Sequence, residues 1–143
     1  MAKLIVKGGS LVWEGRPGRG GHIMYILQWL EGLSRLGHEV LYHDTADGKA
    51  ESTRLFAETM ERWWDPALSA LVQPSGQAAY GLNAKEVERF GRSAAAIISL
   101  GCTYGPEPEP WLANVHPRIL IEQDPGFTRV GKHKHCRRCL WPS

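Results

Sequence analysis

The chain has 143 residues, 43% of them hydrophobic, which is enough for one core of ordinary size but not for two typical domains. Its net charge of +2 is unevenly distributed. Five of the 17 cations lie after Thr128 in a stretch without acids, which leaves residues 1–128 with 12 cations and 15 acids. A mildly acidic body argues against a nucleic acid as partner.

The composition also bears on location. No apolar run approaches the length of a membrane span, and the N-terminus enters an apolar segment without the pattern of a signal peptide. Three cysteines, two of them close to the end, do not form a disulfide framework. We therefore expect a cytoplasmic protein without a membrane span.

The first 44 residues contain a strand, a glycine-rich loop, a helix and a second strand. Residues 4–7 predict the first strand, and residues 39–43 predict the second. Between them, apolar residues at three- and four-residue spacing predict a helix over residues 22–36, which Gly37 ends in a left-handed conformation. Glycines in such a loop let a ligand approach the backbone, and the free N–H groups of the helix that follows favour an anionic or polar group.

The alternation of strands and helices continues. We expect helices over residues 52–64 and 84–93, the second opened by a capping box of Asn83 and Glu86. A hairpin is expected around residues 69–80, and further strands at residues 95–100 and 118–122. Residues 104–110 alternate proline with glutamate and can only form a loop or an extended arm. The order predicts an α/β fold whose mainly parallel sheet is covered by helices on both faces.

Two motifs carry a family resemblance. The first runs from Gly20-Gly21-His22 through the helix to the Leu36-Gly37-His38-Glu39-Val40 turn, and the second is Asp124-Pro125-Gly126-Phe127-Thr128. Together they resemble the N-terminal half of GT-B glycosyltransferases, over most of residues 3–128. The resemblance implies a Rossmann-like domain over residues 1–129 that forms one incomplete GT-B half.

In that family the N-terminal half holds mostly the acceptor, and the C-terminal half binds the nucleotide sugar. The resemblance therefore implies an acceptor-side domain of an enzyme that transfers a sugar from a nucleotide sugar to an acceptor hydroxyl. Both substrates would be used only with a second domain or chain, the chain alone would be inactive, and no cofactor is expected. A non-catalytic binding or assembly module is the alternative from another functional class.

His22 is the candidate catalytic residue. In some inverting GT-B enzymes a histidine at the start of the first helix is the general base, and His22 occupies that position. A helix N-terminus disfavours imidazolium, which leaves a neutral proton acceptor. The alternative is that His22 merely begins the helix and faces solvent.

The candidate ligand-binding residues lie in loops that follow strands. Arginines of the glycine loop would clamp a phosphate together with the loop amides, or would only keep the loop solvated. Asp124 would face the ligand from the last strand, or would only nucleate a tight turn. The full set comprises Arg16, Gly18, Arg19, Gly20, Gly21, Gly101, Asp124 and Gly126.

Asp44 permits a rival interpretation. An acid at the end of the second strand is what a dinucleotide-binding oxidoreductase uses to hold a ribose hydroxyl. The glycines, however, do not form G-x-G-x-x-G. We therefore interpret Asp44 as a solvated acid or helix cap in the loop that contains Asp47 and Gly48.

Other residues have packing interpretations beside functional ones. Cys102 is a candidate nucleophile, but a small buried hydrophobe is the simpler interpretation. Trp29, Trp63 and Trp64 occupy helical positions and predict core packing. Trp13 and Trp111 lie in or beside loops, where each would stack on a sugar ring or cover an edge of the domain.

Residues 130–143 form a basic tail rich in cysteine and histidine. Cys136 and Cys139 have a familiar spacing for zinc, but His133 and His135 abut them too closely to wrap one ion, so no metal site is assigned. We expect this tail to be disordered and to be the end of a truncated form of a longer protein.

Overall fold

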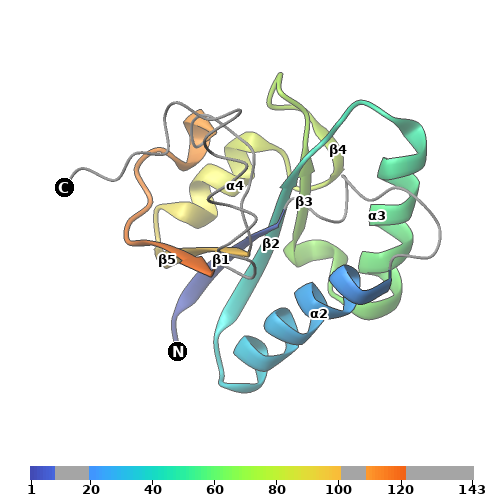
Figure 1. The fold of residues 1–143 in the computed structure, drawn as a ribbon. Helices are drawn as coiled ribbons and strands as arrows, with labels where there is room; N and C mark the ends of the chain where they lie inside the picture. Colours follow the sequence, from blue (N-terminus) through green and yellow to red (C-terminus); the bar gives the residue numbers. More distant parts are fainter. Residues whose placement is uncertain (9–19, 101–108, 122–143) are drawn as a thin grey trace, which may run out of the picture.

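The structure is a computed structural model that describes residues 1–8, 20–100 and 109–121, without the side chains of residues 20–22. These residues form an α/β fold in which three α-helices flank a six-stranded, mostly parallel sheet (Figure 1). The strands are β1 (Lys3–Gly8), β2 (Glu39–Thr45), β3 (Ser69–Val72), β4 (Ala78–Gly81), β5 (Ala94–Leu100) and β6 (Arg118–Ile121). The helices are α2 (Gly20–Arg35), α3 (Ala50–Trp63) and α4 (Ala84–Gly91), with short 3-10 turns η1 (Pro66–Leu68) and η2 (Pro110–Leu112).

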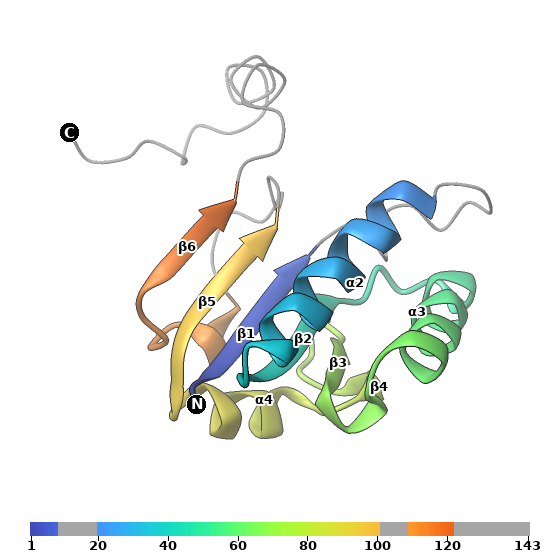
Figure 2. The ribbon, with the colours of Figure 1, turned by 90° about the horizontal axis from the view of Figure 1, so that it is seen from below.

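The sheet has the order β4-β3-β2-β1-β5-β6. All neighbours pair in parallel except β3 and β4, which form the expected antiparallel hairpin. The chain moves outward from β1 to β2 and β3, and then crosses to β5 and β6 on the other side of β1. Figure 2 shows the arrowheads of β1, β5 and β6 pointing the same way. The carboxyl ends of the parallel strands therefore share one side of the sheet, which we call the carboxyl edge.

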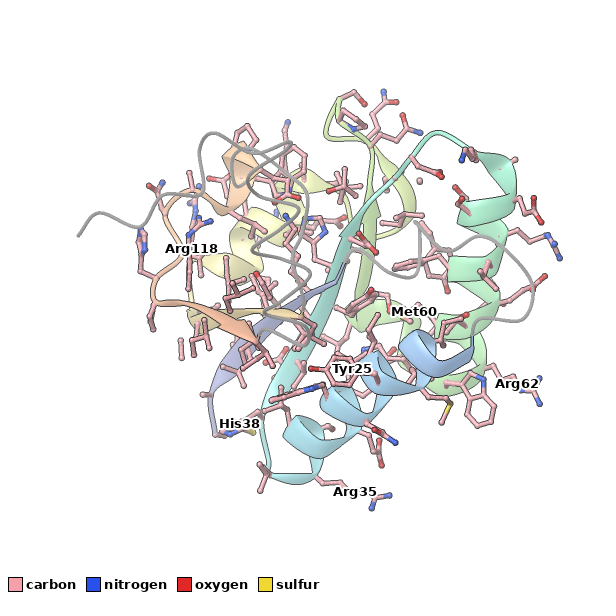
Figure 3. All side chains as sticks on the ribbon, viewed as in Figure 1. Tyr25, Arg35, His38, Met60, Arg62 and Arg118 are labelled. Carbon is pink, nitrogen blue, oxygen red and sulfur yellow. The ribbon has the colours of Figure 1, made fainter. Side chains whose placement is uncertain are left out.

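Helices cover both faces of the sheet, as expected. On one face, α2 and α3 enclose a core that includes Ile26, Leu30, Phe56 and Met60 (Figures 1 and 2). Figure 3 places Met60 inside this layer, whereas Arg35 and Arg62 project outward from the helix ends. On the other face, α4 and η2 pack on a second core. A sheet buried on both faces needs apolar strands, and residues 4–6 of β1 are all buried.

Local signals in the sequence fix several helix ends. The capping box of α4 is confirmed, because the Asn83 side chain accepts from the amides of Lys85 and Glu86 while the Glu86 side chain accepts from the Asn83 amide. Gly37 follows α2 with φ of +85°, as the left-handed stop requires. The capping hydrogen bonds of α4 satisfy amides at the start of the helix that would otherwise lack partners.

One packing prediction was wrong. Trp63 keeps 57% of its surface exposed and contacts the Arg62 guanidinium, 4.9 Å from its ring centre, instead of joining the core. Trp29 and Trp64 are partly buried against the core, as expected. Among the described residues, no helix has the length and apolar character needed to cross a membrane.

Gly81, at the end of β4 in the hairpin, has no room for a side chain. Its φ is +66°, and a Cβ there would lie 2.0 Å from the carbonyl oxygen of Ser69. We expect Gly81→Ala to lower the free energy of unfolding by more than about 2 kcal/mol, because it adds backbone strain and a clash with main chain. Denaturant titration followed by circular dichroism measures the change.

Gly32→Ala is the matched control, since a Cβ on this helical glycine meets nothing within 4 Å. Alanine is the better helix former, so this variant should gain up to about 1 kcal/mol. Equal effects of the two substitutions would contradict the packing described for Gly81.

Candidate functional site

The strand order selects one place on the carboxyl edge for a ligand. The next described element after β1 is α2 and the next after β5 is η2, and these two lie on opposite faces of the sheet. The strand order therefore reverses between β1 and β5, which are neighbours. In open parallel sheets, ligands bind in the crevice at such a reversal, outside the carboxyl ends of the strands. The strands end there at Gly8 and Leu100, which form a pair in the register of β1 and β5.

The predicted site residues are only partly within the described structure. Gly20, Gly21 and His22 form the first turn of α2, the helix that follows β1, but the side chain of His22 is not described. The remaining candidates lie outside the described residues, namely Arg16, Gly18, Arg19, Gly101, Asp124 and Gly126, as do Trp13, Cys102 and the tail over residues 130–143. The parallel strands that precede Gly101 and Asp124, β5 and β6, both end at the carboxyl edge.

A polar cluster not predicted from the sequence lies beside the reversal, on the face covered by α4 and η2. It consists of Lys7, His43, Thr45, Glu109 and Trp111, and we call it the Lys7 cluster. Lys7 pairs with His43 across β1 and β2, so both side chains project from the same face. Glu109 and Trp111, from the segment that leads into β6, cover them.

The Glu109 carboxylate is the negative centre of the Lys7 cluster. Its two oxygens lie 2.5 and 2.6 Å from the Lys7 ammonium nitrogen, and the Thr45 hydroxyl donates to one of them at 2.8 Å. Burial raises the pKa of Glu109, but the charge and hydrogen bond of Lys7 outweigh burial and set the pKa below its ordinary value. Glu109 is therefore ionised at neutral pH, although the Lys7 and Glu109 side chains are only 15% and 12% exposed.

His43 is fully buried and uncharged. Burial is the main cause that lowers its pKa from 6.5 to about 4, and the Lys7 charge adds to this. The Trp111 indole N–H donates to Nε2 at 3.2 Å, which makes Nε2 an acceptor. Nδ1 lies 3.3 Å from the Ala70 carbonyl oxygen and carries the proton. Trp111 is thus bound to the sheet and packs against its core, as the edge-covering interpretation of this residue requires.

Asp44 projects from the opposite face of β2, toward α2 and α3. It is only 3% exposed, so its interpretation as a solvated acid was wrong. It accepts from the Tyr42 hydroxyl at 3.3 Å and from the Thr45 amide at 2.8 Å. Burial raises its pKa to about 8, which leaves the carboxyl group protonated at neutral pH. Asp44 is not a helix cap either, because the N-cap residue of α3 is Lys49 and no side chain caps that helix. Asp47, in the loop before α3, accepts from the Lys49 amide and the Ser52 hydroxyl.

Tyr42 connects Asp44 to the end of β1. Its ring stacks on Phe56 at 5.7 Å, and its hydroxyl lies where a Cβ on Gly8 would approach within 2.9 Å. Burial, followed by the nearby Asp44, raises the pKa of Tyr42 well above its ordinary value. The space that a side chain on Gly8 would need is therefore occupied by Tyr42, so β1 requires glycine at its last residue. This requirement was not predicted from the sequence.

Weak signals for the missed residues exist in the sequence. Lys7 interrupts an apolar strand next to its end, and His43, Asp44 and Thr45 form a polar run at the end of another. Glu109 gave no such signal, because it lies in a proline-rich segment and its partner Lys7 is 102 positions away. Among the described side chains, no three His, Cys, Asp or Glu residues gather in a way that would hold a metal ion.

Comparison with family models, curated proteins and solved structures gave no match for this chain.

Asp44 and His43 predict opposite pH dependences of the free energy of unfolding between pH 4 and 8. Folded Asp44 keeps its proton up to a pKa of about 8, whereas the unfolded acid loses it near 3.8. Folded His43 stays neutral down to about 4, whereas the unfolded imidazole binds a proton below 6.5. From pH 4 to 6.5 the two effects oppose each other. From pH 6.5 to 8 only Asp44 contributes, so the free energy of unfolding should fall by up to about 2 kcal/mol.

Urea titrations at pH 6.5 and 8 measure this decline. Asp44→Asn keeps the acceptor for the Thr45 amide and should abolish it, because asparagine does not titrate. Asp65→Asn is the matched control, since exposed Asp65 also accepts a backbone amide, that of Ala67, and its replacement should leave the decline in place. A decline of equal size in Asp44→Asn would show that Asp44 is ionised in the folded protein.

Proposed function

We propose that the chain is the acceptor-side domain of a GT-B glycosyltransferase-like protein, and that it needs a second domain or chain to transfer a sugar. The observation that carries the proposal is the position of Gly20-Gly21-His22. This motif forms the first turn of α2, the first helix after β1 in the described structure. The Rossmann-like arrangement of the sheet is consistent with one half of that fold.

In this proposal His22 is the general base that takes the proton of the acceptor hydroxyl. The free N–H groups at the start of α2 favour a neutral imidazole there, as proton acceptance requires. The acceptor lies across the carboxyl ends of β1 and β5. The donor nucleotide sugar is held mainly by the partner half, so its affinity for this chain alone is low.

A dinucleotide-binding oxidoreductase is the second candidate, and the location of Asp44 at the end of β2 favours it. Two observations weigh against this function. Asp44 is 97% buried, and its oxygens already accept from Tyr42 and Thr45, so a ribose diol would have to displace these contacts. A protonated carboxyl is also a poorer acceptor for the two ribose hydroxyls than a carboxylate.

Ligand-observed NMR with the full chain tests these functions together, with saccharides, nucleotide sugars, NAD and NADP as separate probes. We expect binding of a saccharide, little or no binding of nucleotide sugars, and no turnover. His22→Ala should weaken the saccharide roughly fivefold, the effect of one hydrogen bond, and His116→Ala, at an exposed position away from α2, should not.

Other results would contradict the proposal. Tight binding of NAD or NADP that Asp44→Ala abolishes would favour the oxidoreductase. Turnover by the chain alone would show that no second half is needed. Binding of no saccharide at all would refute the acceptor-side role.

A further inference from the structure

The hydrogen-bond donors of Lys7 and Thr45 converge on a single point at the carboxyl edge. Lys7 is the penultimate residue of β1, and Thr45 is the last residue of the neighbouring strand β2. Both donate to the carboxylate of Glu109, the ammonium to both oxygens and the hydroxyl to one. Two rigid parallel strands thus hold a pair of donors that fits a planar, two-oxygen anion.

Glu109 is the only anion that the described structure brings to this pair. His43, the nearest titratable neighbour on the same face, is neutral and has both ring nitrogens engaged. Asp44 lies on the opposite face of the sheet and is protonated at neutral pH. Without the Glu109 carboxylate, the largely buried Lys7 ammonium would have no described partner for its charge, which is costly in a protein interior.

The Glu109 carboxylate is free of the main-chain hydrogen bond that holds this residue at the start of η2, in which the Glu109 carbonyl accepts from the Leu112 amide at 2.8 Å. Glu109 precedes η2 as the N-cap residue, but its carboxylate makes no capping hydrogen bond to that turn. Among the described side chains, those of Lys7 and Thr45 are the ones that donate to its carboxylate. A rotation about its side-chain bonds therefore vacates the donor pair without unfolding a helix or a strand.

We propose that Lys7 and Thr45 form a carboxylate-binding subsite of the ligand crevice, and that Glu109 is its internal occupant. A carboxylate on the ligand takes the place of Glu109, so Glu109 competes with the ligand and lowers its affinity. The donor pair lies beside the strand reversal where the ligand is expected. The inference that this ligand is an acceptor bearing a carboxylate rests on the proposed function.

Glu109→Ala opens the subsite to a small anion, and sodium acetate is the probe. In about 50 mM acetate the variant should melt at least about 3 °C higher than in chloride of equal ionic strength, because a bound ion stabilises the folded state. The wild type should shift by less than about 1 °C, since Glu109 fills the subsite. Phosphate, tested in parallel, should raise the melting temperature less than acetate, because the donors grip two coplanar oxygens.

Three variants separate this effect from a general salt effect. Glu58→Ala removes an acid from the exposed Arg54–Glu58 pair, and its response to acetate should equal that of the wild type. In Lys7→Met/Glu109→Ala the acetate response should disappear, because the ammonium is gone. Glu109→Gln should also respond to acetate, because its neutral amide binds the ammonium more weakly than a carboxylate does and is displaced by the ion. This variant replaces the alanine variant if that one does not fold.

The proposal is overturned if neither Glu109 variant responds more strongly than the wild type, or if the response persists without Lys7. A stronger response to phosphate than to acetate would refute the carboxylate assignment. Because the assay contains no saccharide, its failure leaves the acceptor-side function standing. Failure to bind saccharides would equally leave the acetate response unchanged.

Discussion

The parallel pairing of β1 with both of its neighbours is the constraint on which the structure depends. Parallel strands need crossover connections, and here these connections place helices on both faces of the sheet. The strand interiors must then be apolar on both sides, as residues 4–6 are in β1. Polar side chains are accommodated mainly at the strand ends, which is why Lys7, His43, Asp44 and Thr45 gather at a single edge.

The sheet also separates two acids that lie near one another in the fold but differ in charge. On one face, Glu109 is ionised because the charge and hydrogen bond of Lys7 outweigh the effect of burial on its pKa. Asp44, on the other face, has a hydroxyl and an amide as partners and no cation in hydrogen-bond contact, so burial keeps it protonated. The alternation of side chains along β2 therefore determines which acid carries charge at this edge.

The fold could be predicted from the sequence because its signals are local. The apolar spacing of α2, the capping box of Asn83 and Glu86, and the left-handed Gly37 each act within a few residues. Trp63 shows the limit of such signals, because helical spacing alone does not distinguish a buried position from one at the rim.

From the sequence, the candidate site could be predicted only to lie at the carboxyl edge of the sheet, without the side chains that form the Lys7 cluster. The strand order indicates the carboxyl edge as a candidate ligand site, but the pairing of Lys7 with Glu109 joins residues 102 positions apart, and no local pattern encodes it. The burial of Asp44 likewise depends on Tyr42, and on Phe56 stacked against it, more than on the polar residues beside Asp44 in the sequence. The strands thus bring together groups whose chemistry, taken singly along the chain, indicates only solvated loops.

Burying an ion pair at this edge is costly, and hydrophobic residues of similar volume often stabilise a protein as well or better. The cost is easier to understand if the pair also has a ligand to bind. An ammonium held on a rigid strand end is pre-organised for an anion, while an internal carboxylate satisfies its charge until that anion arrives. The Lys7–Glu109 pair then has a role in both states. Without a ligand it stabilises the fold, and in the presence of a ligand Glu109 competes for Lys7 and so lowers the affinity.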